Sequence, residues 1–183
     1  MKKIAICMAD GVEEIEALTV VDLCRRAGME IDMISTQNRG RAMGGHGIQF
    51  ETDLNIKDTD FKEYDGIILP GGGKGTENLM NNMTVLNTVQ NFFEAGKLCA
   101  AICAAPTVLG KAGILRGTKT ICYPGLESQP LGAEVTVESV VKDGNVITSR
   151  GLGTAIDFAL AIIAYYLGDE KAEEIATQVV YQA

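Results

Sequence analysis

The sequence predicts one α/β domain with a mostly parallel β-sheet covered by helices on both faces. Short apolar runs alternate with stretches of helical periodicity from one end of the chain to the other, which is typical of strands joined by crossover helices. These apolar runs are continuous rather than alternating, as expected for strands buried on both faces. A length of 183 residues fits a single core, and no repeat, low-complexity tract or linker divides the chain. We therefore expect a single domain over residues 1–183.

Each element follows from a local pattern. Apolar runs bounded by turn residues predict strands at 4–9, 31–35, 64–69 and 98–102. The glycine-rich piece 40–47 and the run 48–52 read as a hairpin or short edge strands, and Asp143-Gly144 joins 135–141 to 146–149 in a second hairpin. Helical periodicity predicts helices at 13–27, closed by Gly28, and at 84–95, 105–111, 154–167 and 169–180.

Composition and charge exclude several classes of protein. The formal net charge of −8 argues against nucleic acid as a main partner, because such binding depends on clustered Lys and Arg. The longest apolar stretch, 158–167, is about half a bilayer span, and 4–9 is too short for the core of a signal peptide. The five cysteines form no CxxC pair, as expected for free thiols in a reducing compartment. We expect a cytoplasmic protein that does not enter membranes.

Cys103 is the candidate reactive residue. It follows the apolar run 98–102 directly, and Pro106 suits the first turn of a helix, where the missing N–H would be unpaired. Cys103 is thus expected on a sharp strand-to-helix turn near the positive end of a helix dipole, which should lower the pKa of its thiol. The turn resembles a nucleophile elbow without the flanking glycines of hydrolases. The alternative is a buried structural cysteine, which the pattern favours for Cys7, Cys24 and Cys99.

Two further turns are expected at the same sheet edge, where ligands of such sheets bind. They are Asp10-Gly11 and the stretch 69–75, whose glycines could direct backbone N–H groups towards an anion. The stretch 69–75 matches neither a Walker loop nor a dinucleotide fingerprint. Taken alone, the stretch favours a simple turn over a site.

Three glutamates, Glu13, Glu14 and Glu16, lie in the first turn of the first predicted helix, where acidic residues favour the helix dipole. A carboxyl that faces the core has a raised pKa and can stay protonated. Helical spacing places Glu16 on an apolar stripe with Val20, and Glu13 on a similar one with Val20 and Cys24. The residues alone leave open which of the two faces the core.

The single histidine, His46, lies in the glycine-rich segment and is expected in an exposed loop away from Cys103. The residues offer no convincing ligand set for a catalytic metal.

Taken together, these motifs resemble the ThiJ/PfpI superfamily over the whole chain. Within it, the chain is similar to the branch that holds bacterial YajL and the human parkinsonism-linked protein deglycase. The resemblance rests on Asp10-Gly11 followed by Glu13-Glu14-Ile15-Glu16, on Leu69-Pro70-Gly71-Gly72, on Ala100-Ala101-Ile102-Cys103-Ala104-Ala105-Pro106 and on Thr148-Ser149-Arg150-Gly151 with Gly153-Thr154.

The resemblance implies a flavodoxin-like three-layer sandwich, usually a homodimer, with an oxidation-sensitive cysteine at the elbow, here Cys103. It assigns Glu16 as the protonated carboxyl that donates a hydrogen bond to the thiolate, which decides between Glu13 and Glu16. It assigns Gly72 and Ala104 as backbone donors at the site. It implies no cofactor and no metal.

Two positions depart from the pattern of the superfamily. Its protease branch has His after the cysteine, where this chain has Ala104, so peptidase activity is disfavoured. Its human branch has His before a proline, where this chain has Tyr123 before Pro124. A tyrosine hydroxyl is a poor proton acceptor near neutral pH, which counts against a Cys–His dyad. Tyr123 and Gly71 are expected to line the site.

Two functions fit these residues. The first is a cofactor-independent glyoxalase- or deglycase-type enzyme, in which Cys103 attacks small aldehydes or glycated protein thiols and amines and Glu16 moves protons. The second is a redox sensor or chaperone in stress protection that uses oxidation of Cys103. A reactive thiol serves both functions, and only turnover separates them.

Overall fold

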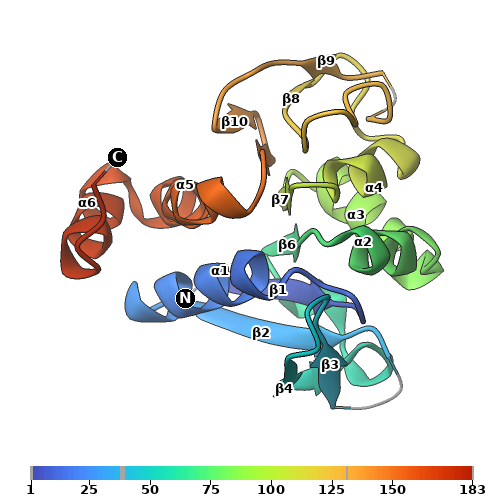
Figure 1. Cartoon of the computed structure of the whole chain (residues 1–183), viewed down its shortest axis with the longest axis horizontal. Coiled ribbons are helices and arrows are strands. Elements are labelled where there is room, and N and C mark those ends of the chain that lie inside the picture. Colours follow the sequence, from blue (N-terminus) through green and yellow to red (C-terminus); the bar gives the residue numbers. More distant parts are fainter. Residues whose placement is uncertain (1, 38–39, 131, 183) are drawn as a thin grey trace.

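A seven-stranded sheet runs through the computed structural model of the chain, which describes residues 2–37, 40–130 and 132–182 (Figure 1). The strand order is β10-β11-β7-β6-β1-β2-β5. Neighbouring strands are parallel from β11 to β5, and only β10 runs antiparallel, against β11. The prediction of a mostly parallel sheet is confirmed.

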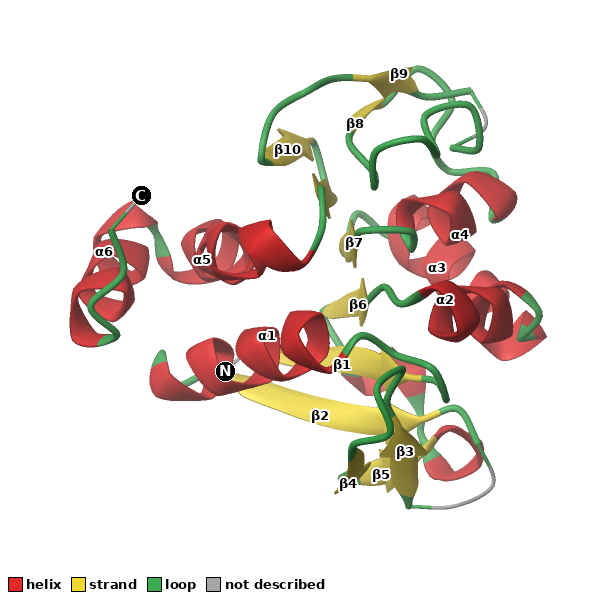
Figure 2. Cartoon of the chain, in the orientation of Figure 1, coloured by secondary structure: helices red, strands yellow, loops and turns green. Residues whose placement is uncertain are grey.

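The secondary structure is shown in Figure 2. The sheet strands are β1 (Lys3–Met8), β2 (Glu30–Ser35), β5 (Leu54–Asn55), β6 (Gly66–Leu69), β7 (Leu98–Ile102), β10 (Val140–Asp143) and β11 (Val146–Ser149). Outside it, β3 (Arg41–Met43) pairs with β4 (Gln49–Glu51), and β8 (Lys119–Thr120) pairs with β9 (Glu134–Val135). The helices are α1 (Glu14–Arg26), α2 (Gly73–Met80), α3 (Met83–Glu94), α4 (Pro106–Lys111), α5 (Ala155–Leu167) and α6 (Asp169–Gln178). Short 3-10 helices span Ile56–Asp58, Phe61–Glu63 and Leu152–Thr154.

The two faces of the sheet carry different helices. In Figure 1, α1, α5 and α6 lie on one side of the strands, and α2, α3 and α4 lie on the other. Alternate residues of β1 point to opposite faces, so Ile4 and Ile6 join one hydrophobic cluster while Ala5 and Cys7 join the other. The result is two apolar layers with the sheet between them.

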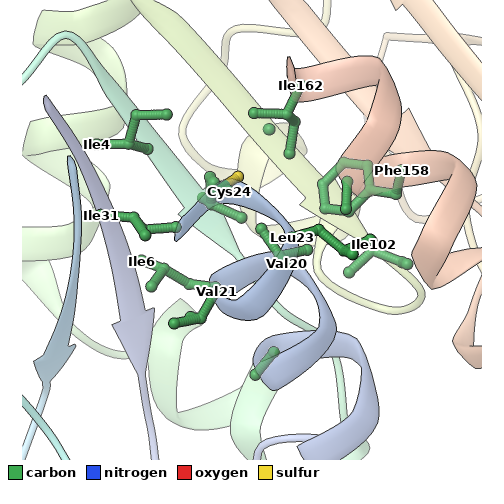
Figure 3. Packing of buried hydrophobic residues seen from close by; sticks show 14 of the residues in the cluster. Ile4, Ile6, Val20, Val21, Leu23, Cys24, Ile31, Ile102, Phe158 and Ile162 are labelled. Carbon is green, nitrogen blue, oxygen red and sulfur yellow. The ribbon is translucent and has the colours of Figure 1, made fainter. Parts of the chain in front are cut away.

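The layer beneath α1 and α5 is shown in Figure 3. Val20 and Cys24 of α1 and Phe158 of α5 are wholly buried there against Ile6 of β1. At about 25 cal/mol per Å² of apolar surface, each such large side chain contributes about 2 kcal/mol on burial. This packing fixes the first turn of α1 against the carboxyl ends of the strands.

The structure corrects the sequence prediction at residues 73–80 and at residue 135. Residues 73–80 form α2, which the sequence analysis did not predict, because Gly73-Lys74-Gly75 reads as a loop. Residue 135 belongs to β9 rather than to the hairpin, whose first strand begins at Val140. Both predicted hairpins, β3–β4 and β10–β11, are present.

In the part of the chain that the structure describes, no helix combines the length and the apolar character that a membrane crossing needs.

Candidate functional site

Three turns meet at the carboxyl ends of β1, β6 and β7. Backbone hydrogen bonds join the first two turns: the N–H of Gly75 donates to Gly11 O over 3.0 Å, and the N–H of Glu13 donates to Gly71 O over 3.0 Å. The start of α1 is thereby tied to the glycine turn after β6. The third turn, after β7, carries Cys103.

Main-chain bonds hold Cys103 from both sides. Its N–H donates to Ser149 O at the end of β11 (3.0 Å), and its carbonyl accepts from the N–H of Tyr123 (2.7 Å). Its φ is +64°, in the left-handed region that costs a non-glycine residue roughly 1–2 kcal/mol. The strained turn between β7 and α4 is the one expected from the sequence. Cys103 is partly exposed, whereas the other four cysteines are buried.

Glu16 lies beside the thiol. It is 1% exposed, and its Oε2 accepts a hydrogen bond from the N–H of Gly71 over 2.9 Å. The Glu16 carboxyl and the Cys103 thiol are also hydrogen-bonded to each other. Glu13 is the N-cap of α1, and its Oε2 lies 3.7 Å from His46 Nδ1. It is therefore Glu16 that lies beside the thiol, as the family resemblance implied.

Gly71 makes this contact possible. A Cβ at this position would lie 2.5 Å from Cys103 Cβ and 2.5 Å from Glu16 Oε2. Any larger residue would therefore push the two side chains apart. The absence of a side chain lets the carboxyl and the thiol share one small enclosed space.

Burial governs the protonation of both groups. Burial raises the pKa of Glu16 to about 7, while the hydrogen bonds from Cys103 and from the N–H of Gly71 act in the opposite direction. The carboxyl is therefore protonated in a substantial fraction of molecules near neutral pH.

The pKa of the Cys103 thiol differs from the value expected from the sequence. Burial, followed by the charge of Glu16 and their hydrogen bond, raises the pKa of Cys103 to about 12, although hydrogen bonds from the backbone N–H groups of Gly72 and Ala104 lower it. The expected low thiol pKa is thus wrong for the resting protein. The helix that follows has only six residues, and burial beside a carboxylate outweighs its dipole.

The two groups titrate as a pair. A proton that leaves Cys103 for the Glu16 carboxylate keeps the total charge unchanged, and it turns the carboxylate that opposes the thiolate into a neutral donor that stabilises it. The backbone N–H groups of Gly72 and Ala104 then face the sulfur. The site can form a thiolate when Glu16 takes the proton.

Tyr123, which the sequence predicts to line the site, is 51% exposed and packs against Gly151, where a Cβ would lie 3.4 Å from Tyr123 Cδ2. Together with Arg150 and Leu152 they line an open cavity of about 300 Å³. The backbone N–H of Tyr123, rather than its hydroxyl, contacts Cys103.

A second cavity of about 290 Å³ lies between α2 and the start of α4. Its lining includes Gly73 and Ala104, which directly follow Gly72 and Cys103, together with Thr76 and Gln129. Thr76 was not predicted as a site residue, because α2 was not predicted. Ser149 was not predicted to contact Cys103, because it does so through its main-chain carbonyl, which residue type does not indicate.

Comparison with known proteins accounts for this arrangement. Residues 2–165 match the model of the DJ-1/PfpI family. The chain belongs to the DJ-1/PfpI family. It is 35% identical to Protein dj-1beta of Drosophila melanogaster over 177 residues, which are 96% of this chain and 95% of that protein.

Other relatives and solved structures support the same family assignment. Protein DJ-1 homolog B of Arabidopsis thaliana is 36% identical over 98% of this chain, which spans only 41% of that longer protein. Among solved structures, Drosophila DJ-1beta superimposes with a TM-score of 0.95 at 34% identity, and oxidized Toxoplasma gondii DJ-1 with 0.96 at 32% identity, each over the full length of both chains. The flavodoxin-like sandwich that the resemblance implied is thus confirmed.

Proposed function

We propose that this protein is a cofactor-independent enzyme of stress protection that acts on small reactive carbonyl compounds in the cytoplasm. The observation that carries the proposal is the hydrogen-bonded pair of the buried Glu16 carboxyl and the partly exposed Cys103 thiol, in which burial raises the pKa of the carboxyl to about 7. Such a carboxyl can accept and return protons at neutral pH, and a thiol beside it is a nucleophile.

The reaction begins with the addition of Cys103 to an aldehyde such as methylglyoxal. The sulfur forms a bond to the aldehyde carbon as the thiol proton passes to Glu16, and the carbonyl oxygen becomes an alkoxide that takes this proton to give a hemithioacetal. The backbone N–H groups of Gly72 and Ala104, which face the sulfur, are placed to stabilise the alkoxide.

Glu16 then moves a proton between the two carbons of the adduct. The carboxylate removes the hydrogen of the former aldehyde carbon, which gives an enediol, and returns the proton to the neighbouring carbon. The product is a thioester of a hydroxy acid. Water cleaves the bond between carbon and sulfur, releases lactate and restores the Cys103 thiol, so the sequence of steps needs no external oxidant or reductant.

Glycated protein thiols and amines are the corresponding larger substrates of a deglycase. The open cavity beside Tyr123 and Arg150 provides a space of about 300 Å³ for the part of such a substrate that does not react. We further propose that the protein is a homodimer, which light scattering on the purified chain tests directly.

The test is lactate production from methylglyoxal by metal-free protein. Turnover should be lost in Cys103→Ser and in Glu16→Gln, which keeps the size of the side chain but cannot shuttle the proton. The matched control is Glu51→Gln on β4, an exposed glutamate outside the site. Turnover equal to the parent in either site variant would refute the mechanism.

A second candidate function is a redox sensor. It is favoured by the exposure of Cys103 alone among the five cysteines, and one of the structural neighbours is an oxidized DJ-1. In this case mild peroxide should convert Cys103 to a sulfinate, detected by mass spectrometry, in a protein with no methylglyoxal turnover. Turnover that depends on both site residues would count against a purely sensory role.

A further inference from the structure

A second cluster of titratable side chains lies at the start of α1, away from the thiol. Glu13 and Glu14 at the N-terminus of the helix meet His46, the single histidine of the chain, in the loop between β3 and β4. One ligand atom from each of the three residues lies within 4.8 Å of the other two. The proposed carbonyl chemistry uses none of them.

The distances suit a metal ion. His46 Nδ1 lies 2.9 Å from Glu14 Oε2 and 3.7 Å from Glu13 Oε2. A tetrahedral ion with bonds of about 2.0–2.1 Å holds neighbouring ligand atoms roughly 3.4 Å apart. The two distances from His46 Nδ1 bracket that value, and the three ligand atoms lie within 4.8 Å of one another.

The charges also call for a cation. The Glu13 and Glu14 side chains are only 15% and 5% exposed. Among the described residues, no lysine or arginine lies within 4.0 Å of either carboxylate, and His46 is their one basic neighbour. The Glu13 side chain makes no capping hydrogen bond to the first turn of α1. A bound cation would neutralise the two neighbouring, largely buried carboxylates.

The loop holds one ligand in place. The backbone N–H of His46 donates to Glu14 Oε1 over 2.8 Å, which leaves Oε2 turned towards the imidazole. A Cβ on Gly44 would collide with the Glu14 carboxylate, so only glycine lets the loop close over it. Such contacts to the free oxygen of a ligand orient it for metal binding.

We propose that Glu13, Glu14 and His46 form a binding site for one divalent transition-metal ion of the Zn²⁺ type. The imidazole of His46 is 68% exposed, which leaves the ion a path from solvent and room for a water molecule as the fourth ligand. An imidazole among the ligands favours Zn²⁺ over Mg²⁺ and Ca²⁺, which take oxygen ligands. This ligand set was not predicted from the sequence, because Glu14 and His46 lie 32 positions apart.

The test uses the full chain with Cys103→Ser, because a thiol also binds zinc. Zn²⁺ is titrated by calorimetry, and the ring protons of His46 are followed by NMR, where one histidine gives one unambiguous set of signals. We expect one equivalent of zinc to bind and to shift these signals, and Mg²⁺ at the same concentration to leave them unchanged. His46→Ala and Glu13→Gln should each weaken binding at least about tenfold.

The variants are chosen so that a failure to fold does not decide the outcome. Glu13→Gln removes a charge without breaking a hydrogen bond of the described structure, so its fold should persist. Glu14→Gln is avoided because it would disturb the loop. Glu51→Gln, on the neighbouring hairpin, controls for surface charge and should bind zinc as the parent does. Parent binding weaker than about 1 mM, or unchanged affinity in His46→Ala, would show that the cluster is only a hydrogen-bonded clamp on the loop.

Discussion

Replacement of Glu16 by Gln should remove the part of the pH dependence of stability that Glu16 causes between about pH 5 and about pH 8. Gln keeps an oxygen that accepts the N–H of Gly71 and has an amide that donates to the sulfur. It removes only the ability to ionise. Because Glu16 is 1% exposed, no solvent screening offsets the cost of ionising it in the folded chain.

The magnitude follows from the pKa. The pKa of Glu16 rises from 4.5 to about 7 on folding, so the unfolded chain releases this proton at lower pH than the folded chain. The group stabilises the fold fully below about pH 4.5, and the contribution is lost as pH rises through about 7. The complete difference of about 2.5 pKa units corresponds to about 3 kcal/mol, of which about 2.5 kcal/mol falls between pH 5 and pH 8.

Urea unfolding at about pH 5, 6, 7 and 8 measures the effect as the difference between the parent and Glu16→Gln. Ionisations that both proteins share, such as that of His46, cancel in this difference. At an m-value of about 2 kcal/mol per M, the urea midpoint of the variant minus that of the parent should increase by roughly 1 M from pH 5 to pH 8.

Parallel pH profiles for the two proteins would refute the reasoning, since they would mean that the Glu16 carboxyl ionises in the fold as readily as in water. Glu51→Gln, an exposed glutamate, should follow the parent at every pH.

Three further predictions concern the elements around the site. Gly71→Ala should lower the free energy of unfolding by about 1–3 kcal/mol and slow alkylation of Cys103 by iodoacetamide, because the added Cβ would lie 2.5 Å from that residue and from Glu16. Cys103→Gly should be more stable than Cys103→Ala by about 1 kcal/mol in urea unfolding, because φ is +64° at this position. Phe158→Ala should cost about 3–5 kcal/mol, measured in the same way, because it empties a wholly buried site between α5 and the sheet.

Each of these has its own control. Gly73→Ala, where a Cβ would meet nothing within 4 Å, should leave both stability and alkylation close to the parent. Equal stability of the two Cys103 variants would indicate that the turn relaxes out of the left-handed region. A loss below about 1 kcal/mol for Phe158→Ala would contradict the packing described for this layer.

The positions of the main strands along the chain and of most helices could be predicted from the sequence, because buried parallel strands are continuous apolar runs. The runs at 31–35, 98–102 and 146–149 lie within strands of the structure. Prediction failed where tertiary contacts override local signals. Three glycines in 71–73 and another at 75 read as a loop, yet 73–80 is a helix held by the turn after β1.

The chemistry of the site was predictable only in part. The position of Cys103 after an apolar run and before Pro106 is a local pattern, and the sequence contains it. The choice between Glu13 and Glu16 depends on where α1 begins and on what it packs against, which helical periodicity cannot supply. The pKa of the thiol depends on a carboxyl 87 positions away in the chain, so a rule based on the helix dipole alone gave the wrong sign.

The main-chain bonds of Cys103 bear on how an oxidised form could be recognised. Its N–H is held by the end of β11 and its carbonyl by Tyr123, and neither bond involves the sulfur. Oxidation would therefore add oxygen atoms and negative charge to the side chain while the backbone stays anchored. The oxidised and reduced proteins would then share one shape, and any partner that tells them apart must touch the mouth of this turn.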